Sequence, residues 1–264
     1  MLPSVILRMS EFISNRKGEK ISVLVERQPN HKGLAFVMHG LGGFKEQEHI
    51  IAIARAFNEA GYTVVRFDTT HAQGESDGAL AEVTPTKSYE DLEDVIQWVG
   101  TQQWYQEPFS LSGYSLGGFC VAYYAENHPE KVKALILAAP AISGKFVAST
   151  RSREELERWQ RRGYQEYESK SMPGVVKRVN WTFMADYQYY DLLLHVDRLI
   201  MPVLIIVGEH DVRTPPAHQR QLYDLLPGKK EMHVVKGAEH GFYQESERRE
   251  VQSVLLDWLV HEAC

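Results

Sequence analysis

The sequence predicts an α/β fold in which a mostly parallel sheet is covered by helices on both faces. Short, continuous apolar runs recur along the chain, as expected for buried parallel strands. Stretches with apolar residues at helical spacing alternate with these runs, which favours strand–helix–strand units. The 264 residues are 44% hydrophobic and 24% charged, and this length and composition suit one large globular domain with a substantial core.

The first half of the chain begins with a predicted hairpin. Residues 5–13 and 20–27 read as two strands joined by a polar turn. Helices are expected around residues 50–57 and from Thr84–Pro85, where threonine suits the N-cap and proline the first turn. The buried strands expected in this half are 34–40, 62–68 and 108–114.

The second half continues the alternation of strands and helices. A helix follows the strand at 108–114 and is ended by Pro129, and another lies near 216–226. Further strands are expected at 132–140, 202–207 and 230–235. The final helix is amphipathic, and its apolar face carries Val251, Val254, Leu255, Trp258 and Leu259.

One segment interrupts this alternation. Residues 141–187 are polar, basic and aromatic, and they are much longer than an ordinary connection. Ser152 and Glu155 have the spacing of a capping box, which predicts the start of a helix inside the segment. We therefore expect a core formed by 1–140 and 188–264, with 141–187 inserted as a small cap over the edge of the sheet.

The side chains of this cap leave two questions open. Its basic residues alternate with glutamates, and we interpret them as a solvated face rather than a site for acidic substrates; they are Arg158, Arg161, Arg162, Lys177 and Arg178. Its aromatic residues could line an apolar pocket or simply hold the cap together; they are Trp159, Tyr164, Tyr167, Trp181, Phe183, Tyr187, Tyr189 and Tyr190.

Candidate site residues follow the predicted strands directly or, for His240, a little past the last strand, because ligands of open parallel sheets bind beyond the carboxyl ends of the strands. These residues are His39, Gly40, Leu41, Asp68, Ser115, Glu209, His210, Asp211 and His240. Ser115 is the predicted nucleophile, since it occupies the centre of a G-x-S-x-G pattern between a strand and a helix. The alternative is a small residue in a glycine-rich turn.

The base and the acid are predicted from their order along the chain. A serine hydroxyl needs an adjacent base, and the order Ser, acid, His selects His240 among the eleven histidines. Asp211 follows a strand and precedes a helix that we expect to open at Thr214–Pro215; it would orient the imidazole. Glu209 and Asp197 are rival acids.

An oxyanion formed at the scissile carbonyl needs two N–H donors. One is expected from the backbone of Leu116, the residue after the nucleophile, and the other from Leu41 in the loop "HGLGG". Glycines in this loop would also suit a flexible turn, and the two interpretations are compatible.

The motifs "HGLGG", "FDTTHAQGESDG", "GYSLGG", "VGEHD" and "GAEHGF" occur in order across residues 34–260. Through these motifs the chain resembles the serine α/β-hydrolase superfamily, and within it the monoglyceride-lipase, serine-aminopeptidase and cinnamoyl/feruloyl-esterase group. The resemblance implies the α/β-hydrolase fold, with an eight-stranded sheet and a cap after the sixth strand. It also implies Ser115, Asp211 and His240 as catalytic triad, with Leu41 and Leu116 as oxyanion donors.

The function expected from these residues is hydrolysis of carboxylic esters, with short or medium acyl chains, monoacylglycerols or hydroxycinnamate esters all compatible. An acyl thioesterase, or an amidase or peptidase, would use the same residues. A ligand-binding relative without turnover is the alternative outside enzymes, although the complete triad argues against it. No cofactor and no metal are expected, since a serine triad needs neither.

Charge and hydropathy restrict the partners. The net charge of −6 argues against a nucleic-acid binder, and no apolar run is long enough to span a bilayer. The N-terminus is a poor signal peptide, and Cys120 and Cys264 form no disulfide framework. We expect a soluble, cytoplasmic enzyme that acts on a small-molecule ester. The sequence leaves its oligomeric state open, a homodimer included.

Overall fold

The computed structural model of the chain describes residues 6–170 and 172–261. Its main sheet has the strand order β1-β2-β4-β3-β5-β6-β9-β10, in which β1–β2 and β2–β4 are antiparallel and every other pair is parallel. The strands are β1 (Leu7–Ser14), β2 (Lys20–Arg27), β3 (Gly33–Met38), β4 (Tyr62–Phe67), β5 (Phe109–Tyr114), β6 (Val132–Ala138), β9 (Val203–Gly208) and β10 (Lys230–Val235). The predicted eight-stranded, mostly parallel sheet is therefore confirmed.

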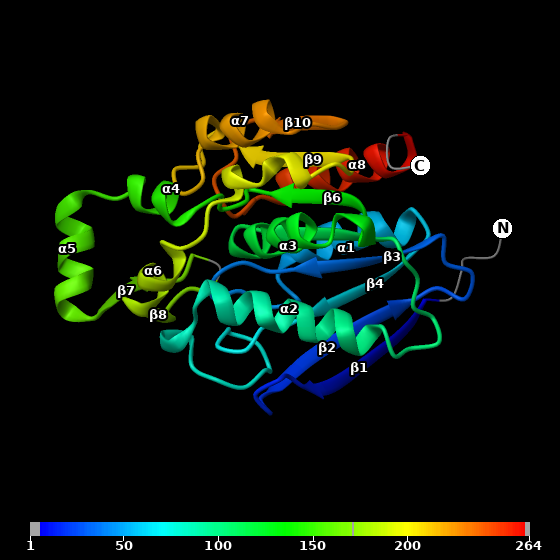
Figure 1. Cartoon of the computed structure of the whole chain (residues 1–264), viewed down its shortest axis with the longest axis horizontal. Coiled ribbons are helices and arrows are strands. Elements are labelled where there is room, and N and C mark those ends of the chain that lie inside the picture. The colour runs from blue at the N-terminus through cyan, green and yellow to red at the C-terminus, as the bar shows by residue number, and fades with distance from the viewer. Residues whose placement is uncertain (1–5, 171, 262–264) are drawn as a thin grey trace.

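Helices cover both faces of this sheet, as the alternation of apolar patterns predicts (Figure 1). The helices α1 (Glu48–Glu59) and α8 (Glu245–His261) pack together on one face. The other face is covered by α2 (Pro85–Val99), α3 (Leu116–Asn127) and α7 (Pro216–Leu225). The central strands β3, β4 and β5 are buried along their whole length, which explains their continuous apolar runs.

Two strands end two residues earlier than their apolar runs suggest, and the strand expected at 62–68 ends one residue earlier, at Phe67. The strand expected at 34–40 ends at Met38, and the strand expected at 132–140 ends at Ala138. Ala139 then takes a φ of 46°, a left-handed conformation that cannot continue a strand. Residue 5 of the first expected strand and Cys264 lie outside the described residues.

Residues 141–187, which we call the cap segment, lie outside the main sheet, at the edge to which the parallel strands point (Figure 1). The helix α5 begins with the predicted capping box of Ser152 and Glu155. The elements of the cap segment are α4 (Gly144–Ser149), α5 (Arg153–Arg162), β7 (Tyr164–Glu168), β8 (Val176–Asn180) and α6 (Thr182–Tyr187), with β7 and β8 paired antiparallel. The short 3₁₀ turns of the chain are η1 (Leu80–Glu82), η2 (Pro129–Lys131), η3 (Leu192–Leu194) and η4 (Val196–Arg198).

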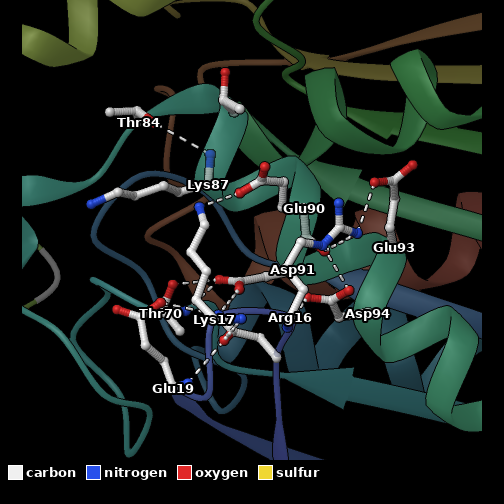
Figure 2. A network of polar contacts seen from close by, with 12 residues as sticks. Arg16, Lys17, Glu19, Thr70, Thr84, Lys87, Glu90, Asp91, Glu93 and Asp94 are labelled. Atoms are coloured by element: carbon white, nitrogen blue, oxygen red, sulfur yellow. Dashed lines mark hydrogen bonds and ion pairs between the residues drawn. The ribbon is translucent and has the colours of Figure 1, made fainter.

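A network of polar contacts fastens the N-terminal hairpin to α2 and to the loop after β4 (Figure 2). The Arg16 guanidinium donates to Asp94 at 2.9 Å. The buried Asp91 carboxylate accepts from the Thr70 N–H at 2.6 Å, from the Thr70 hydroxyl at 2.7 Å and from the Asn15 amide at 3.1 Å. The turn of the hairpin therefore supports the loop that begins at the carboxyl end of β4.

Among residues 6–170 and 172–261, no helix is long and apolar enough to cross a bilayer.

Candidate active site

Ser115 lies where β5 ends and α3 begins. Its backbone has φ 54° and ψ −115°, a conformation that an L-residue adopts only when its surroundings impose it. A Cβ atom at Gly113 would lie 2.2 Å from the carbonyl oxygen of Gly117, and a Cβ atom at Gly117 would lie 2.4 Å from that of His39. The two glycines of the G-x-S-x-G pattern therefore permit the sharp strand-to-helix turn that the sequence predicts.

His240 connects Ser115 with Asp211. Its Nε2 atom lies 3.0 Å from the Oγ atom of Ser115, and its Nδ1 atom lies 2.7 Å from Oδ2 of Asp211. The Tyr114 hydroxyl donates to the His240 carbonyl at 3.0 Å and holds the loop after β10 against the end of β5. The structure thus brings together the predicted serine, histidine and aspartate from the loops that follow three different strands.

Thr214 is a site residue that the sequence analysis missed. Its hydroxyl donates to Oδ2 of Asp211 at 2.7 Å and its N–H to Oδ1 at 2.9 Å, and the Arg213 N–H donates to Oδ1 at 2.8 Å. The expectation that Thr214–Pro215 opens a helix is wrong: α7 begins at Pro216 and Pro215 is its N-cap. Thr214 instead fixes the carboxylate, and an aspartate three residues before a threonine is the signal that could have indicated this.

The Asp211 carboxyl is buried, with 2% of its surface exposed. Burial alone would raise its pKa, but the hydrogen bond and charge of His240, together with the donors of Thr214, leave the pKa below its ordinary value. The carboxylate therefore stays ionised at neutral pH, and it favours the imidazole tautomer whose Nδ1–H points toward it. In that tautomer the Nε2 atom is free to accept the proton of Ser115.

The loop after β3 lies directly against Ser115. A Cβ atom at Gly40 would come within 3.0 Å of the Ser115 Cβ. Within the described chain the Leu41 N–H donates to no protein acceptor, and the Leu116 N–H belongs to the first turn of α3, where helices leave their amides unpaired. The two amides predicted to bind an oxyanion are therefore neighbours of the serine.

The cap segment contacts this loop through Lys177. The Lys177 ammonium donates to the Gly42 carbonyl at 2.6 Å, and the side chain is buried. The prediction that Lys177 belongs to a solvated basic face is therefore wrong, whereas the other four basic residues of that set are exposed. Strand alternation explains the difference, since Lys177 and Arg178 point to opposite sides of β8.

The rival acids have other partners or positions. The Glu209 carboxylate is exposed and accepts the Gly237 N–H at 2.8 Å. Asp197 lies in η4 and does not line a cavity that contains Ser115. Neither carboxylate contacts His240 within the described chain, so the geometry favours Asp211.

His39 and Asp68 also follow strands, but their contacts are structural. The His39 Nε2 atom accepts the Thr69 N–H at 3.0 Å. The Asp68 carboxylate accepts from the N–H and the ammonium of Lys45 at 2.6 and 2.7 Å. Across the residues that the structure describes, no group of three histidine, cysteine or acidic side chains is placed to hold a metal ion.

Ser115 and His240 open into a cavity of about 330 Å³ between the main sheet and the cap segment. Three of the cap aromatics, Tyr167, Phe183 and Tyr187, form part of its wall, and Trp159 instead packs behind them against Trp181 and Phe183. The remaining lining residues are Leu41, Tyr114, Leu116, Ala141, Val147, Thr150, Arg151, Gln165, Val212, Arg213 and Thr214. A cavity of this size, largely apolar with a few polar groups, suits a small ligand.

Comparison with known protein families gives a match to one model. Residues 29–171, more than half of the chain, match the family described as serine aminopeptidase, S33. The matched region includes the loop after β3, Ser115 and most of the cap segment.

The individual relatives and structures below share less than 30% sequence identity with this chain. An uncharacterized 31.7 kDa protein of the traX-finO intergenic region of Escherichia coli is 24% identical over 258 residues, which cover 85% of this chain and 89% of the relative. The mitochondrial palmitoyl-protein thioesterase ABHD10 of Mus musculus is 28% identical over 180 residues, covering 67% and 58%. Among solved structures, Est1E from Butyrivibrio proteoclasticus with bound ferulic acid has a TM-score of 0.80 at 20% identity, covering 96% of this chain and 98% of Est1E.

Proposed function

The chain belongs to the serine aminopeptidase, S33 family of α/β hydrolases, and we propose that it is a serine hydrolase that cleaves carboxylic esters. The observation that carries this proposal is the hydrogen-bonded series Ser115–His240–Asp211, of which Ser115 and His240 line the cavity. Leu41 and Leu116 lie beside the serine as oxyanion donors. Residues 141–187 act as a cap over a core formed by 1–140 and 188–264.

The reaction follows from the roles of these groups. His240 accepts the proton of Ser115 as Oγ attacks the ester carbonyl, and the Leu41 and Leu116 amides bind the oxyanion. The imidazolium then protonates the alcohol as it departs, and the acyl group remains bonded to Ser115. A water molecule, activated by His240, releases the acid and restores the free serine. Each turnover consumes one ester and one water and yields one acid and one alcohol.

Asp211 supports both proton transfers without giving up its own charge. Its depressed pKa keeps it ionised, so it stabilises the imidazolium each time His240 is protonated. Thr214 and the backbone of Arg213 hold the carboxylate in place. Thr214 is therefore a positioning residue, which acts on the reacting atoms only through Asp211 and His240.

A second candidate is the cleavage of acyl thioesters. The mostly apolar cavity favours an acyl chain, and a relative that is 28% identical is named a palmitoyl-protein thioesterase. A thioester needs the same nucleophile and oxyanion donors, but its thiol leaves with less help from His240. The two candidates therefore differ in substrate and share one mechanism.

Hydrolysis of p-nitrophenyl esters from acetate to palmitate, alongside thioesters with the same acyl chains, tests the proposal. We expect turnover of the oxygen esters, with the best chain length reporting the depth of the cavity. Faster turnover of every matched thioester would favour the thioesterase. Background rates with all substrates would contradict the hydrolase and favour a ligand-binding role.

Replacing Lys177 by methionine is expected to lower kcat for a neutral ester about tenfold, because a small displacement of the loop that carries Leu41 weakens binding of the oxyanion. The substitution keeps most of the apolar side chain and removes the ammonium group with its hydrogen bond to the Gly42 carbonyl. Steady-state kinetics measure the effect. Arg178→Met, on the exposed side of the same strand, is the matched control and should retain kcat. Equal kcat values for a folded Lys177→Met variant and the wild type would contradict this role.

A further inference from the structure

The side chains that line the cavity at Ser115 carry an excess of positive charge, and the nearby Asp211 carboxylate lies behind His240 rather than in the lining. A smaller cavity of about 60 Å³ adjoins the main one, and both are lined by Leu41, Tyr114, Tyr167, Arg213 and His240. Among the described residues, the two linings contain four cationic side chains and no aspartate or glutamate. The cations are Arg151, Lys170, Lys177 and Arg213. This excess stands out in a chain with 35 acidic and 29 basic residues.

Arg213 is the central member of this group, because it lines both cavities. Its guanidinium lies 5.8 Å from the centre of the Tyr167 ring and forms no ion pair with a described carboxylate. Its backbone N–H holds Asp211, so the position of the residue is tied to the catalytic loop. Arg213 is an exposed residue at the edge of both cavities, and no described carboxylate pairs with its guanidinium.

Arg151 lines the main cavity from the cap segment and forms no ion pair with a described carboxylate, although the charge of Glu155 acts on it from a longer distance. It donates to the Val147 carbonyl at 2.7 Å and lies 5.6 Å from the centre of the Trp159 ring. Burial, together with the charge of Arg213, lowers the pKa of Arg151. The same two causes lower the pKa of Lys177 to about 8. The charge of Arg213 therefore repels both Arg151 and Lys177, and a bound anion would relieve this repulsion.

Several arginines elsewhere in the chain form ion pairs with carboxylates, although others on the surface do not. Arg16 pairs with Asp94, Arg178 with Glu166, and Arg248 with Glu48. Of the four cations at the cavities, Lys170 alone has such a partner, Glu239. Unpaired guanidinium groups in a partly enclosed site are suited to bind a carboxylate or phosphate through paired N–H donors.

We infer that the ester cleaved at Ser115 carries an anionic group, which the Arg213 and Arg151 guanidinium groups bind while Lys177 adds positive charge nearby. This inference rests on the proposed hydrolase function and specifies its substrate class. A carboxylate is the simplest such group. It can belong to the acyl part, as in a half-ester of a dicarboxylic acid, or to the leaving alcohol.

Two matched pairs of substrates test the inference. For the acyl side, mono-p-nitrophenyl adipate is compared with p-nitrophenyl hexanoate; for the alcohol side, 3-acetoxybenzoate is compared with 3-acetoxybenzamide. We expect kcat/KM to be at least about tenfold higher for the anionic member of one pair, and Arg213→Met to lower that ratio about tenfold. Arg151→Met should lower it as well. Arg158→Met, an exposed residue of the same cap segment, is the control that keeps the ratio of the wild type.

Binding provides a readout that does not need turnover. Monomethyl adipate and methyl hexanoate are titrated calorimetrically into the Ser115→Ala variant, with and without Arg213→Met. Tighter binding of the anionic ester that is lost in the Arg213→Met background supports the inference, even if no ester is hydrolysed. The absence of hydrolysis would count only against the proposed hydrolase function. If Arg151→Met does not fold, the exposed Arg213 still decides the test. Equal kcat/KM within both pairs and equal binding of the two methyl esters would overturn the inference.

Discussion

Ser115→Ala is expected to lower kcat/KM for the best ester by about 10⁴- to 10⁶-fold, because His240 then has no hydroxyl to activate and no acyl-enzyme can form. The variant should fold, since alanine keeps the Cβ atom and removes only the oxygen that lies 3.0 Å from His240. Steady-state kinetics give the loss of rate, and thermal unfolding verifies the fold.

The control for this substitution comes from the same strand. The Ser112 hydroxyl is buried in β5 and has no hydrogen-bond partner in the described chain, so Ser112→Ala should retain the activity of the wild type. A Ser115→Ala variant as active as Ser112→Ala would make Ser115 a turn residue. The ligand-binding interpretation would then be preferred.

Asp211→Asn is expected to lower kcat by about 10³- to 10⁴-fold with a smaller change in KM. The amide oxygen can still accept the N–H groups of Arg213 and Thr214, so the loop keeps its shape. An amide NH₂ facing His240 favours the wrong imidazole tautomer, and no carboxylate remains to stabilise the imidazolium.

The matched control is Glu209→Gln, which alters the rival carboxylate two residues earlier. We expect its kcat to stay within about twofold of the wild type, because Glu209 contacts Gly237 rather than His240. If Glu209→Gln caused the larger loss, the assignment of the acid would be wrong.

The parts of the fold that the sequence predicts are those fixed by local patterns. Continuous apolar runs marked the buried strands, and Thr84 accepts the Lys87 N–H at the start of α2, as its place before a proline suggested. Ser115, Asp211 and His240 were predicted from a short pattern and chain order, because the end of each strand fixes where the next residue lies. Strand ends were less predictable. The left-handed conformation at Ala139 ends a strand, but alanine continues the apolar run and so does not mark this change in the sequence.

The features that the sequence did not predict depend on contacts between distant segments. Lys177 lies on the buried side of a short hairpin whose two faces are both partly polar, so alternation alone could not tell which side faces the core. Arg151 and Arg213 are far apart in the chain and meet only where the cap segment covers the loop after β9. The charge of the cavity is therefore a property of the folded chain.

Covalent labelling tests the central claim, that Ser115 is a nucleophile activated by His240. The protein is treated with a fluorophosphonate, and its intact mass and peptides are measured. We predict one adduct per chain on the peptide that contains Ser115, with labelling that is slowed strongly in His240→Ala and absent in Ser115→Ala. An unlabelled protein, or an adduct on another residue that persists in Ser115→Ala, would contradict the account.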